Sequence, residues 1–264
     1  MPVFRYFGFG SNLDLTSLRA KGVHPTRSRQ AELPGWRLRF NVRHFFDHEG
    51  GVGNIEPSDD PGDRVLGVLH ECPDEDLPAL DETEARGVGY DRIEIAVQTA
   101  EGSETAFAYV GRPDFIDNRC LPSRRYLNIL IRGARRAGLE PAYVASLEHQ
   151  PTLAVTDAPP FRHPPGPKPH FDAESLAEHP DYTALYGAVF DMSAARPAHA
   201  FLKGMFGGRD MTLFHLKRMD SSDGTETDAD IREDRLDGAQ RRYLNNYLRE
   251  YAREYRYVGR FDYH

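Results

Sequence analysis

The sequence has 264 residues, of which 39% are hydrophobic and 28% charged, a composition typical of a globular protein with a sizeable core. Its formal net charge of −8 argues against nucleic acid or an anionic membrane as the main partner, because both repel an acidic surface. Two cysteines, Cys72 and Cys120, are too few for a disulfide framework and predict reduced thiols. The first residues lack a secretory signal, and no apolar run approaches the roughly 18 residues of a membrane helix, so we expect a cytoplasmic protein.

The first 150 residues are predicted to be mostly strands with a few helices. Helices are expected at residues 14–20, at 73–84 with Pro73 in the first turn, and at 123–137 before Gly138. Strands are expected at residues 3–9, 36–42, 50–55, 64–70, 91–99 and 105–110. Because short turns join these strands, they predict an α+β fold in which helices flank a small mixed or antiparallel β-barrel.

The rest of the chain divides into two parts. Residues 151–180 are rich in proline, which cannot feed a central sheet, and predict a linker or a wrapping arm. Residues 181–264 predict an α/β subdomain that packs on the barrel and shapes one side of its pocket. Its expected elements are strands at 182–190 and 211–219, a helix at 197–206, an acidic loop at 220–230 and a long helix at 237–255.

A glycine-rich turn follows the first strand. Gly8 and Gly10 precede Ser11 and Asn12, and glycine readily adopts a positive φ, so successive amide groups could face one concavity that binds an anion or oxyanion. A tight turn with an ordinary helix cap would give the same pattern. The glycine spacing matches neither a dinucleotide-binding fingerprint nor a P-loop, and the P-loop lysine is missing.

Five segments in register resemble the γ-glutamylcyclotransferase family. Residues 6–13, YFGFGSNL, resemble its Y-F-x-Y-G-S-N-L signature, and residues 61–68, PGDRVLGV, resemble its P-G-D-x-V-x-G-V strand. Residues 80–84, LDETE, resemble L-D-x-x-E, and residues 89–95, GYDRIEI, resemble x-Y-x-x-I-E-V. Tyr126 resembles the tyrosine before the family's G-A-x-x-x-G-L, and the whole resemblance covers about residues 4–150.

The resemblance implies a small β-barrel and a reaction on a small γ-glutamyl substrate. The substrate's own α-amine attacks its γ-carbonyl and gives 5-oxoproline and a free amine, with no cofactor and no metal. Only the free amine attacks, so a general base is needed, and the resemblance selects Glu84, which should be partly desolvated. Glu82 is the rival base, but on a helix the two side chains point about 200° apart and only one enters the site.

The resemblance also implies the groups that bind the substrate. Backbone amides of residues 8–11 would stabilise the oxyanion or hold the α-carboxylate. Phe9 stands where the family usually has tyrosine, so the site lacks one hydroxyl. For Tyr90 and Tyr126 the alternative is a core tyrosine with a satisfied hydroxyl. The implied substrate-binding residues are Tyr6, Phe7, Gly8, Phe9, Gly10, Ser11, Asn12, Tyr90 and Tyr126.

Two other outcomes of the same fold stay open at this point. Water could replace the amine as the attacking group, which would make the protein a γ-glutamyl amide hydrolase, or the barrel could bind a small ligand without catalysis. His44 and His48 have the spacing of a metal pair on a helix, but their context predicts a hairpin, so we expect no metal site. The sequence is compatible with a homodimer.

Overall fold

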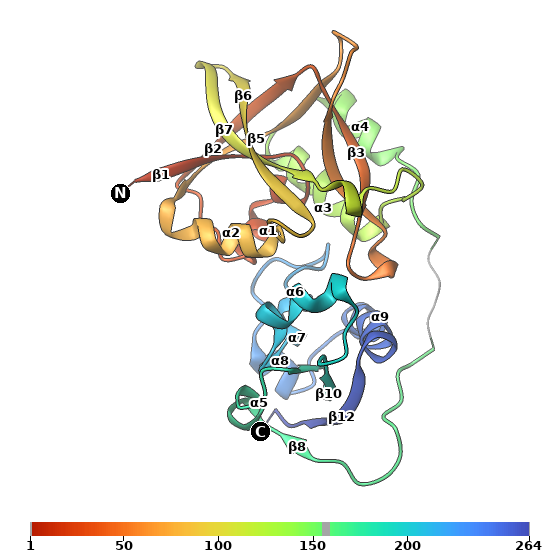
Figure 1. Cartoon of the computed structure of the whole chain (residues 1–264). Coiled ribbons are helices and arrows are strands. Elements are labelled where there is room, and N and C mark those ends of the chain that lie inside the picture. Colours follow the sequence, from red (N-terminus) through yellow and green to blue (C-terminus); the bar gives the residue numbers. More distant parts are fainter. Residues whose placement is uncertain (1, 155–158, 264) are drawn as a thin grey trace. The chain divides into compact units, whose positions relative to one another are not determined.

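The computed structural model describes residues 2–154 and 159–263 (Figure 1). The chain divides into two compact units. The first unit contains Met1–His44 and Glu49–Ala154, and the second contains Phe45–His48 and Val155–His264. The segment 151–180 that the sequence predicts to be a linker includes residues 155–158, which lie outside the described residues.

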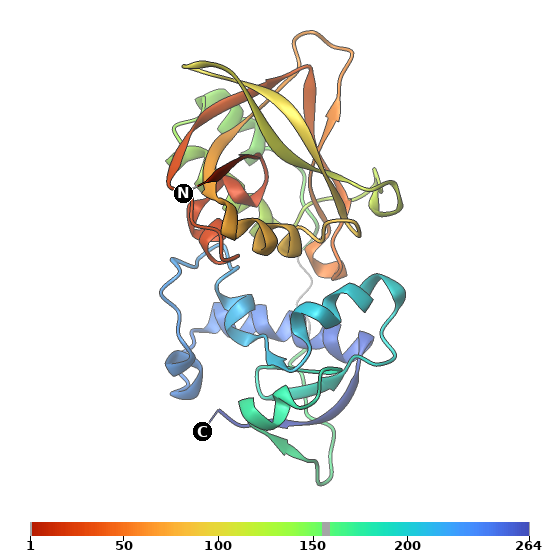
Figure 2. The same cartoon turned by 60° about the vertical axis from the view of Figure 1, so that its left-hand side comes forward.

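A closed five-stranded barrel forms the first unit (Figure 2). Its strands are β1 (Val3–Gly8), β2 (Arg27–Pro34), β5 (Arg64–Pro73), β6 (Tyr90–Thr99) and β7 (Gly102–Gly111), and a separate pair contains β3 (Trp36–Arg43) and β4 (Gly51–Pro57). The order around the barrel is β1-β5-β2-β6-β7, and a parallel contact between Tyr6 and Phe107 closes it. The predicted α+β fold with a small β-barrel is confirmed.

Alternation along the strands creates the barrel core. In β6, Ile95 and Val97 are buried whereas their neighbours Glu94, Ala96 and Gln98 are exposed, as a period of two requires. The inward side chains of several strands meet there. The fully buried members of this core are Phe7, Val65, Leu69, Val97 and Ala108.

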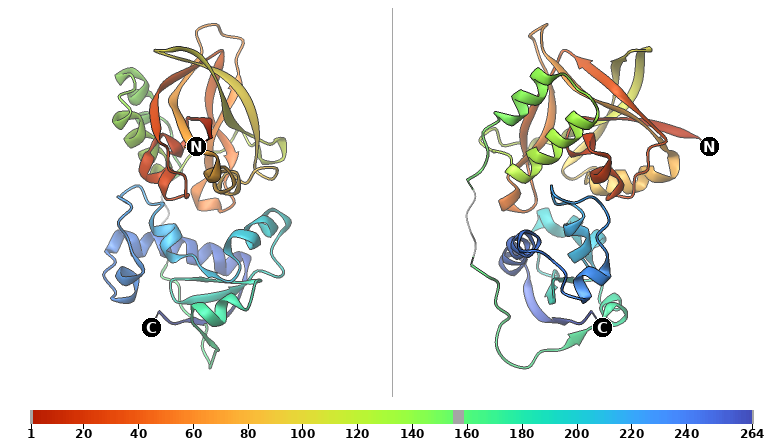
Figure 3. Two further views of the ribbon diagram at one scale, coloured as in Figure 1. Left: turned by 90° about the vertical axis from the view of Figure 1, so that its left-hand side faces the viewer. Right: turned by 180° about the vertical axis from the view of Figure 1, so that it is seen from behind.

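Helices flank the barrel, and α3 packs against α4 (Figure 3). The helical elements of this unit are η1 (Ser11–Leu13), α1 (Leu15–Arg19), η3 (Asp74–Asp76), α2 (Leu77–Thr83), η4 (Pro113–Phe115), α3 (Arg124–Arg136) and α4 (Pro141–Glu148). The predicted limits of α3 are confirmed by its caps: the Ser123 side chain accepts from the amide of Tyr126, and Gly138 follows with φ of 69°.

The predicted helix over 73–84 begins later than expected. Pro73 ends β5, because this strand pairs with β1 as far as the Val3–Pro73 register pair. A single 3-10 turn then leads into α2, whose first turn contains Pro78. The prediction that Pro73 lies in the first turn of the helix is therefore wrong.

A second sheet organises the second unit, with strand order β11-β9-β10-β12-β8 (Figure 3). Its strands are β8 (His170–Phe171), β9 (Tyr182–Leu185), β10 (Ala188–Asp191), β11 (Arg209–Asp210) and β12 (Arg256–Phe261). Its helices are α5 (Ala173–Ala177), α6 (Pro197–Phe206), α7 (Thr212–Leu216), α8 (Asp228–Arg232) and α9 (Gly238–Glu254), and the 3-10 turn η2 (Asp47–Glu49) begins in this unit.

Four predictions for this part of the chain are corrected. The expected single strand at 182–190 is the β9–β10 hairpin, which turns at Tyr186 and Gly187 with φ of 43° and 82°. The expected strand at 211–219 contains α7, because its buried Met211, Thr212, His215, Leu216 and Met219 recur at helical spacing. The expected loop at 220–230 contains the start of α8, and β8 and α5 lie within 151–180.

The long helix of this unit agrees with its prediction. Asp237 caps α9 by accepting from the amides of Ala239 and Gln240. The predicted apolar face is buried and consists of Leu244, Tyr247, Leu248 and Tyr251. Phe46 belongs to the same core and stacks on Tyr251 with the ring centroids 5.4 Å apart.

Candidate active site

The turn after β1 is shaped by close approach rather than by unusual dihedral angles. Neither Gly8 nor Gly10 has a positive φ, so the expectation that these glycines adopt left-handed conformations is wrong. A Cβ on Gly8 would meet the Asn12 carbonyl oxygen at 3.0 Å and His70 Nε2 at 3.1 Å. A Cβ on Gly10 would meet the Tyr126 hydroxyl at 2.8 Å. Glycine is required at both positions because another group already occupies the space of a side chain.

Asn12 connects this turn to Glu84. Its Nδ2 donates to the Tyr6 hydroxyl at 2.7 Å and to Glu84 Oε1 at 2.9 Å. Asn12 is 2% exposed, so both bonds form away from solvent. The Lys21 ammonium donates to Asn12 Oδ1 at 2.7 Å and to Glu84 Oε1 at 3.0 Å. The structure thus brings Tyr6, Asn12 and Glu84 together, and it adds a lysine that the sequence analysis did not identify.

Glu84 lies directly after α2, where it forms the C-cap. Its side chain is 14% exposed, and Glu82, two residues earlier, is exposed. Asp81 fixes this helix to the barrel because its carboxylate accepts from the Tyr109 hydroxyl at 2.6 Å and from Arg92 Nη1 at 2.9 Å. The geometry therefore favours Glu84 over Glu82 as the carboxylate that faces the turn.

Two tyrosine hydroxyls bond to the backbone of one residue of β4, Gly53. The Tyr126 hydroxyl accepts from the Gly53 amide at 2.8 Å, and the Tyr90 hydroxyl donates to the Gly53 carbonyl at 2.7 Å. Burial raises the pKa of both tyrosines, so both hydroxyls stay protonated at neutral pH. The Ser11 amide is a further donor to Tyr126, which ties α3 to the turn.

The comparisons with known proteins point to one family. A model of the AIG2-like family matches residues 64–147. A γ-glutamylcyclotransferase of Bos taurus is 30% identical over 148 residues, which are 54% of this chain and 77% of the relative. The Homo sapiens γ-glutamylcyclotransferase is 30% identical over 149 residues, with 55% of this chain and 77% of the relative covered. The chain belongs to the γ-glutamylcyclotransferase family.

A solved structure supports the same assignment. A structure titled γ-glutamyl cyclotransferase superposes with a TM-score of 0.52 at 29% identity and covers 59% of this chain and 92% of its own. The family resemblance seen in the motifs is thereby confirmed. The motifs that carry the resemblance contain Glu84, Tyr90 and Tyr126. In this member of the family Glu84 bonds to Asn12 of the turn, Tyr126 bonds to Ser11 of the turn, and Tyr90 bonds to Gly53 of β4.

His70 is a second residue that the sequence analysis missed. It is fully buried in β5, opposite Tyr6 in the strand register, and its Nε2 lies 3.0 Å from the Asn12 carbonyl oxygen. Because a carbonyl only accepts, Nε2 carries the proton, and Nδ1 accepts from the Ser28 hydroxyl at 2.8 Å. Burial lowers the pKa of His70 to about 4, so the ring is neutral and holds the turn by a hydrogen bond.

The remaining predicted site residues with described side-chain contacts are one polar residue near Lys21 and two phenylalanines in the barrel core. Ser11 Oγ lies 3.4 Å from Lys21 Nζ. The side chains of Phe7 and Phe9 are buried in the barrel core, with their ring centroids 6.3 Å apart. The two cysteines are free, as predicted.

The described residues contain no group of three or more His, Cys, Asp or Glu side chains placed to hold a metal ion. His44 follows β3 and His48 lies in η2, so the two do not share a helix face. Among the helices of residues 2–154 and 159–263, none combines the length and the apolar character that crossing a membrane demands.

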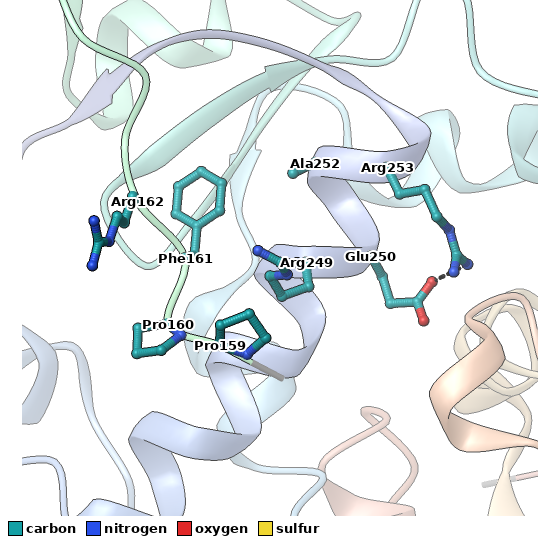
Figure 4. Close-up of a pocket in the computed structure, with 8 residues that line it drawn as sticks. All are labelled: Pro159, Pro160, Phe161, Arg162, Arg249, Glu250, Ala252 and Arg253. Carbon is teal, nitrogen blue, oxygen red and sulfur yellow. Dashed lines mark hydrogen bonds and ion pairs between the residues drawn. The ribbon is translucent and has the colours of Figure 1, made fainter. Parts of the chain in front are cut away.

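The second unit holds a pocket of 680 Å³ beside α9 (Figure 4). None of the residues predicted for the active site lines it. Figure 4 shows Arg253 paired with Glu250, whose Oε2 lies 2.5 Å from Arg253 Nη2. The pocket is lined by Pro159, Pro160, Phe161, Arg162, Arg249, Glu250, Ala252 and Arg253.

Proposed function

We propose that this protein converts a γ-glutamyl amide or γ-glutamyl amino acid into 5-oxoproline and a free amine. Membership of the γ-glutamylcyclotransferase family supports this class of reaction. The observation that carries it in this chain is the mostly buried Glu84 carboxylate, which is hydrogen-bonded at 2.9 Å to Asn12 of the glycine turn. The proposed base and the glycine turn therefore belong to one hydrogen-bonded unit.

The reaction needs no nucleophile from the protein. Holding the glutamyl chain folded brings its α-amine against its γ-carbonyl, and this proximity supplies much of the rate. Glu84 takes a proton from the α-ammonium, and the amine nitrogen forms a bond to the γ-carbon. The γ-carbon to leaving-nitrogen bond then breaks, and Glu84 returns the first proton to the departing nitrogen. The ring nitrogen loses a second proton as the lactam forms, and this proton converts the freed amine to its ammonium form. No water is consumed, and the atoms of the substrate are divided between the two products.

Backbone donors of the turn suit the charge that develops on the γ-carbonyl oxygen. The 3-10 turn uses the amides of Leu13 and Asp14 for its own bonds to the carbonyls of Gly10 and Ser11. Amides at the start of such a turn have no partner within it. The Gly10 and Asn12 amides therefore lie outside the turn's own hydrogen bonding, and we assign them to the oxyanion or to the substrate's α-carboxylate, whereas the Ser11 amide donates to Tyr126.

The test is product analysis by mass spectrometry. Purified protein is incubated with γ-glutamyl amino acids, γ-glutamyl amines and glutathione, and 5-oxoproline and free glutamate are quantified. We expect 5-oxoproline from the wild type and a loss of about 10²- to 10⁴-fold in Glu84→Gln, the range for a general acid–base residue. The matched control is Glu82→Gln on the same helix, which should keep wild-type activity because Glu82 is exposed.

Each alternative has its own product. Free glutamate without 5-oxoproline would assign a γ-glutamyl amide hydrolase, in which water replaces the α-amine. Neither product from any conjugate would refute catalysis on this substrate class and would favour a ligand-binding barrel. The conjugate that is consumed names the leaving amine, and glutathione is one member of the panel.

A further inference from the structure

A buried lysine ammonium touches the proposed base. Lys21 follows α1, 63 positions before Glu84 in the sequence, and its Nζ lies 3.0 Å from Glu84 Oε1. The same Nζ lies 2.7 Å from Asn12 Oδ1 and 3.4 Å from Ser11 Oγ. The side chain of Lys21 is 8% exposed, and that of Glu84 is 14% exposed. The pair is therefore poorly screened by water, and each charge depends on the other.

The residue type at this position is informative. Lys21 is the only lysine in residues 1–167, where every other permanent side-chain cation is an arginine. The planar arginine fork suits both oxygens of one carboxylate, as Arg119 shows with Asp117, whose two oxygens accept from Nε and Nη2 at 3.0 Å each. An ammonium has three donors on one compact centre. Three separate acceptors, on Ser11, Asn12 and Glu84, are a geometry that an ammonium fits and an arginine fork does not.

Lys21 and Asn12 both act on the same carboxylate oxygen. Asn12 Nδ2 and Lys21 Nζ each donate to Glu84 Oε1, so these two donors leave Oε2 for another partner. A carboxylate held by one oxygen has a fixed plane, and its second oxygen then has a fixed direction.

We propose that Lys21 is a positioning residue that anchors Glu84 through Oε1, so that Oε2 takes the proton from the substrate's α-ammonium. This role rests on the proposed cyclotransfer reaction. The ammonium donates within the protein to Ser11, Asn12 and Glu84, so we assign the α-carboxylate of the substrate to other groups of the site. The proton that Oε2 receives is the one returned to the leaving amine, and Lys21 itself keeps its protons throughout.

The alternative role is direct binding of the substrate's α-carboxylate, and steady-state kinetics separates the two. An anchor for the base acts in the chemical step and changes kcat, whereas a ligand for the α-carboxylate acts in binding and changes KM. We compare wild type, Lys21→Gln, Lys21→Arg and Lys21→Ala with γ-glutamylalanine and with whichever panel conjugate the wild type consumes fastest. Lys217→Met, in the second unit, is the control for loss of a lysine elsewhere.

We expect Lys21→Gln to lower kcat by about 10- to 100-fold with KM changed less than about twofold, the size of one hydrogen bond to a charged group. Lys21→Arg, which keeps the charge without the three-acceptor fit, should retain more kcat than Lys21→Gln. Ethylammonium added to Lys21→Ala should restore kcat in part, which a loss of packing alone would not allow. Thermal unfolding of each variant identifies any variant that does not fold. If the neutral variants do not fold, the comparison of Lys21→Arg with the wild type tests the proposal.

Two results would overturn the proposal. One is an unchanged kcat with a raised KM in the Lys21 variants, which would make Lys21 a ligand for the substrate. The other is wild-type kinetics in every folded variant. If the wild type itself forms no 5-oxoproline, the proposed function is refuted, and the proposed role of Lys21 is refuted with it. The wild-type control alone identifies this outcome.

Discussion

Replacing Gly133 by alanine should destabilise the first unit, although alanine is the better helix former. Gly133 lies inside α3, where this helix crosses the turn at Leu13 and Asp14. A Cβ on Gly133 would lie 2.5 Å from the Asp14 amide nitrogen and 2.6 Å from the Leu13 carbonyl carbon. Both are backbone atoms, so the new methyl group is accommodated only if α3 or the turn moves.

The sign of the effect follows from two opposed quantities. Alanine in place of glycine within a helix contributes about 1 kcal/mol to stability, and overpacking a tight contact costs about 1–3 kcal/mol. The short backbone distances at Gly133 put its cost near the upper limit, so we expect a net loss of about 1–2 kcal/mol. Gly204 in α6 is the matched control, because nothing lies within 4 Å of a Cβ built there. Gly204→Ala should therefore stabilise its own unit by up to about 1 kcal/mol.

Urea unfolding measures both variants. The single tryptophan, Trp36, lies in β3 and reports on the first unit by fluorescence, whereas far-UV circular dichroism includes the helices of the second unit. We expect Gly133→Ala to lower the midpoint of the fluorescence transition and Gly204→Ala to raise that of the second unit. Stabilisation by Gly133→Ala would refute the packing argument. The same variant should also lose activity, because Leu13 and Asp14 directly follow Asn12.

Two further predictions concern the groups that hold the turn. Burial lowers the pKa of His70 from 6.5 to about 4, so the unfolded chain binds this proton at a higher pH than the folded protein does. The part of the unfolding free energy that is present above pH 6.5 is therefore lost as the pH falls toward 4. Relative to His70→Gln, the wild type should lose up to about 3 kcal/mol of unfolding free energy across this window in urea titrations, and a pH-independent difference would contradict the assignment. Tyr126→Phe leaves the buried Gly53 amide without its acceptor and should cost about 1–3 kcal/mol by Trp36 fluorescence; a loss within error of zero would show that the bond contributes nothing.

The elements with a clear period could be predicted from the sequence, and those held by charges could not. The helices α3, α6 and α9 carry apolar stripes, α3 and α9 also have side-chain N-caps, and the limits of all three agree with prediction to within about one residue. The strand β2 was missed because only Ala31 and Leu33 are buried in it. Its remaining stability comes from partners far along the chain, such as Arg29 bonded to Glu71 at 2.7 Å. A strand whose outer face consists of cross-strand ion pairs has no apolar alternation to detect.

The candidate site divides in the same way. The motif resemblance selected Glu84, and the geometry places it beside Asn12. His70 and Lys21 escaped notice because they act through contacts that exist only in the folded barrel. His70 reaches the turn because the β1–β5 register sets it opposite Tyr6. The isolation of Lys21 among arginines was visible in the sequence, but its meaning depends on the three acceptors that folding gathers around it.

The absence of positive φ at Gly8 and Gly10 strengthens the case for a preorganised turn. His70 holds the turn from β5, Tyr126 holds it from α3, and Lys21 holds it from the segment after α1. Each of the three contacts is possible because a glycine leaves room for it or because a long side chain reaches over the turn. Donors fixed before the substrate arrives need no reorganisation as charge develops, which is the condition under which backbone amides stabilise an oxyanion most effectively. A mobile glycine turn would lack this property, so close packing around the glycines serves the proposed reaction better than the freedom that the sequence suggested.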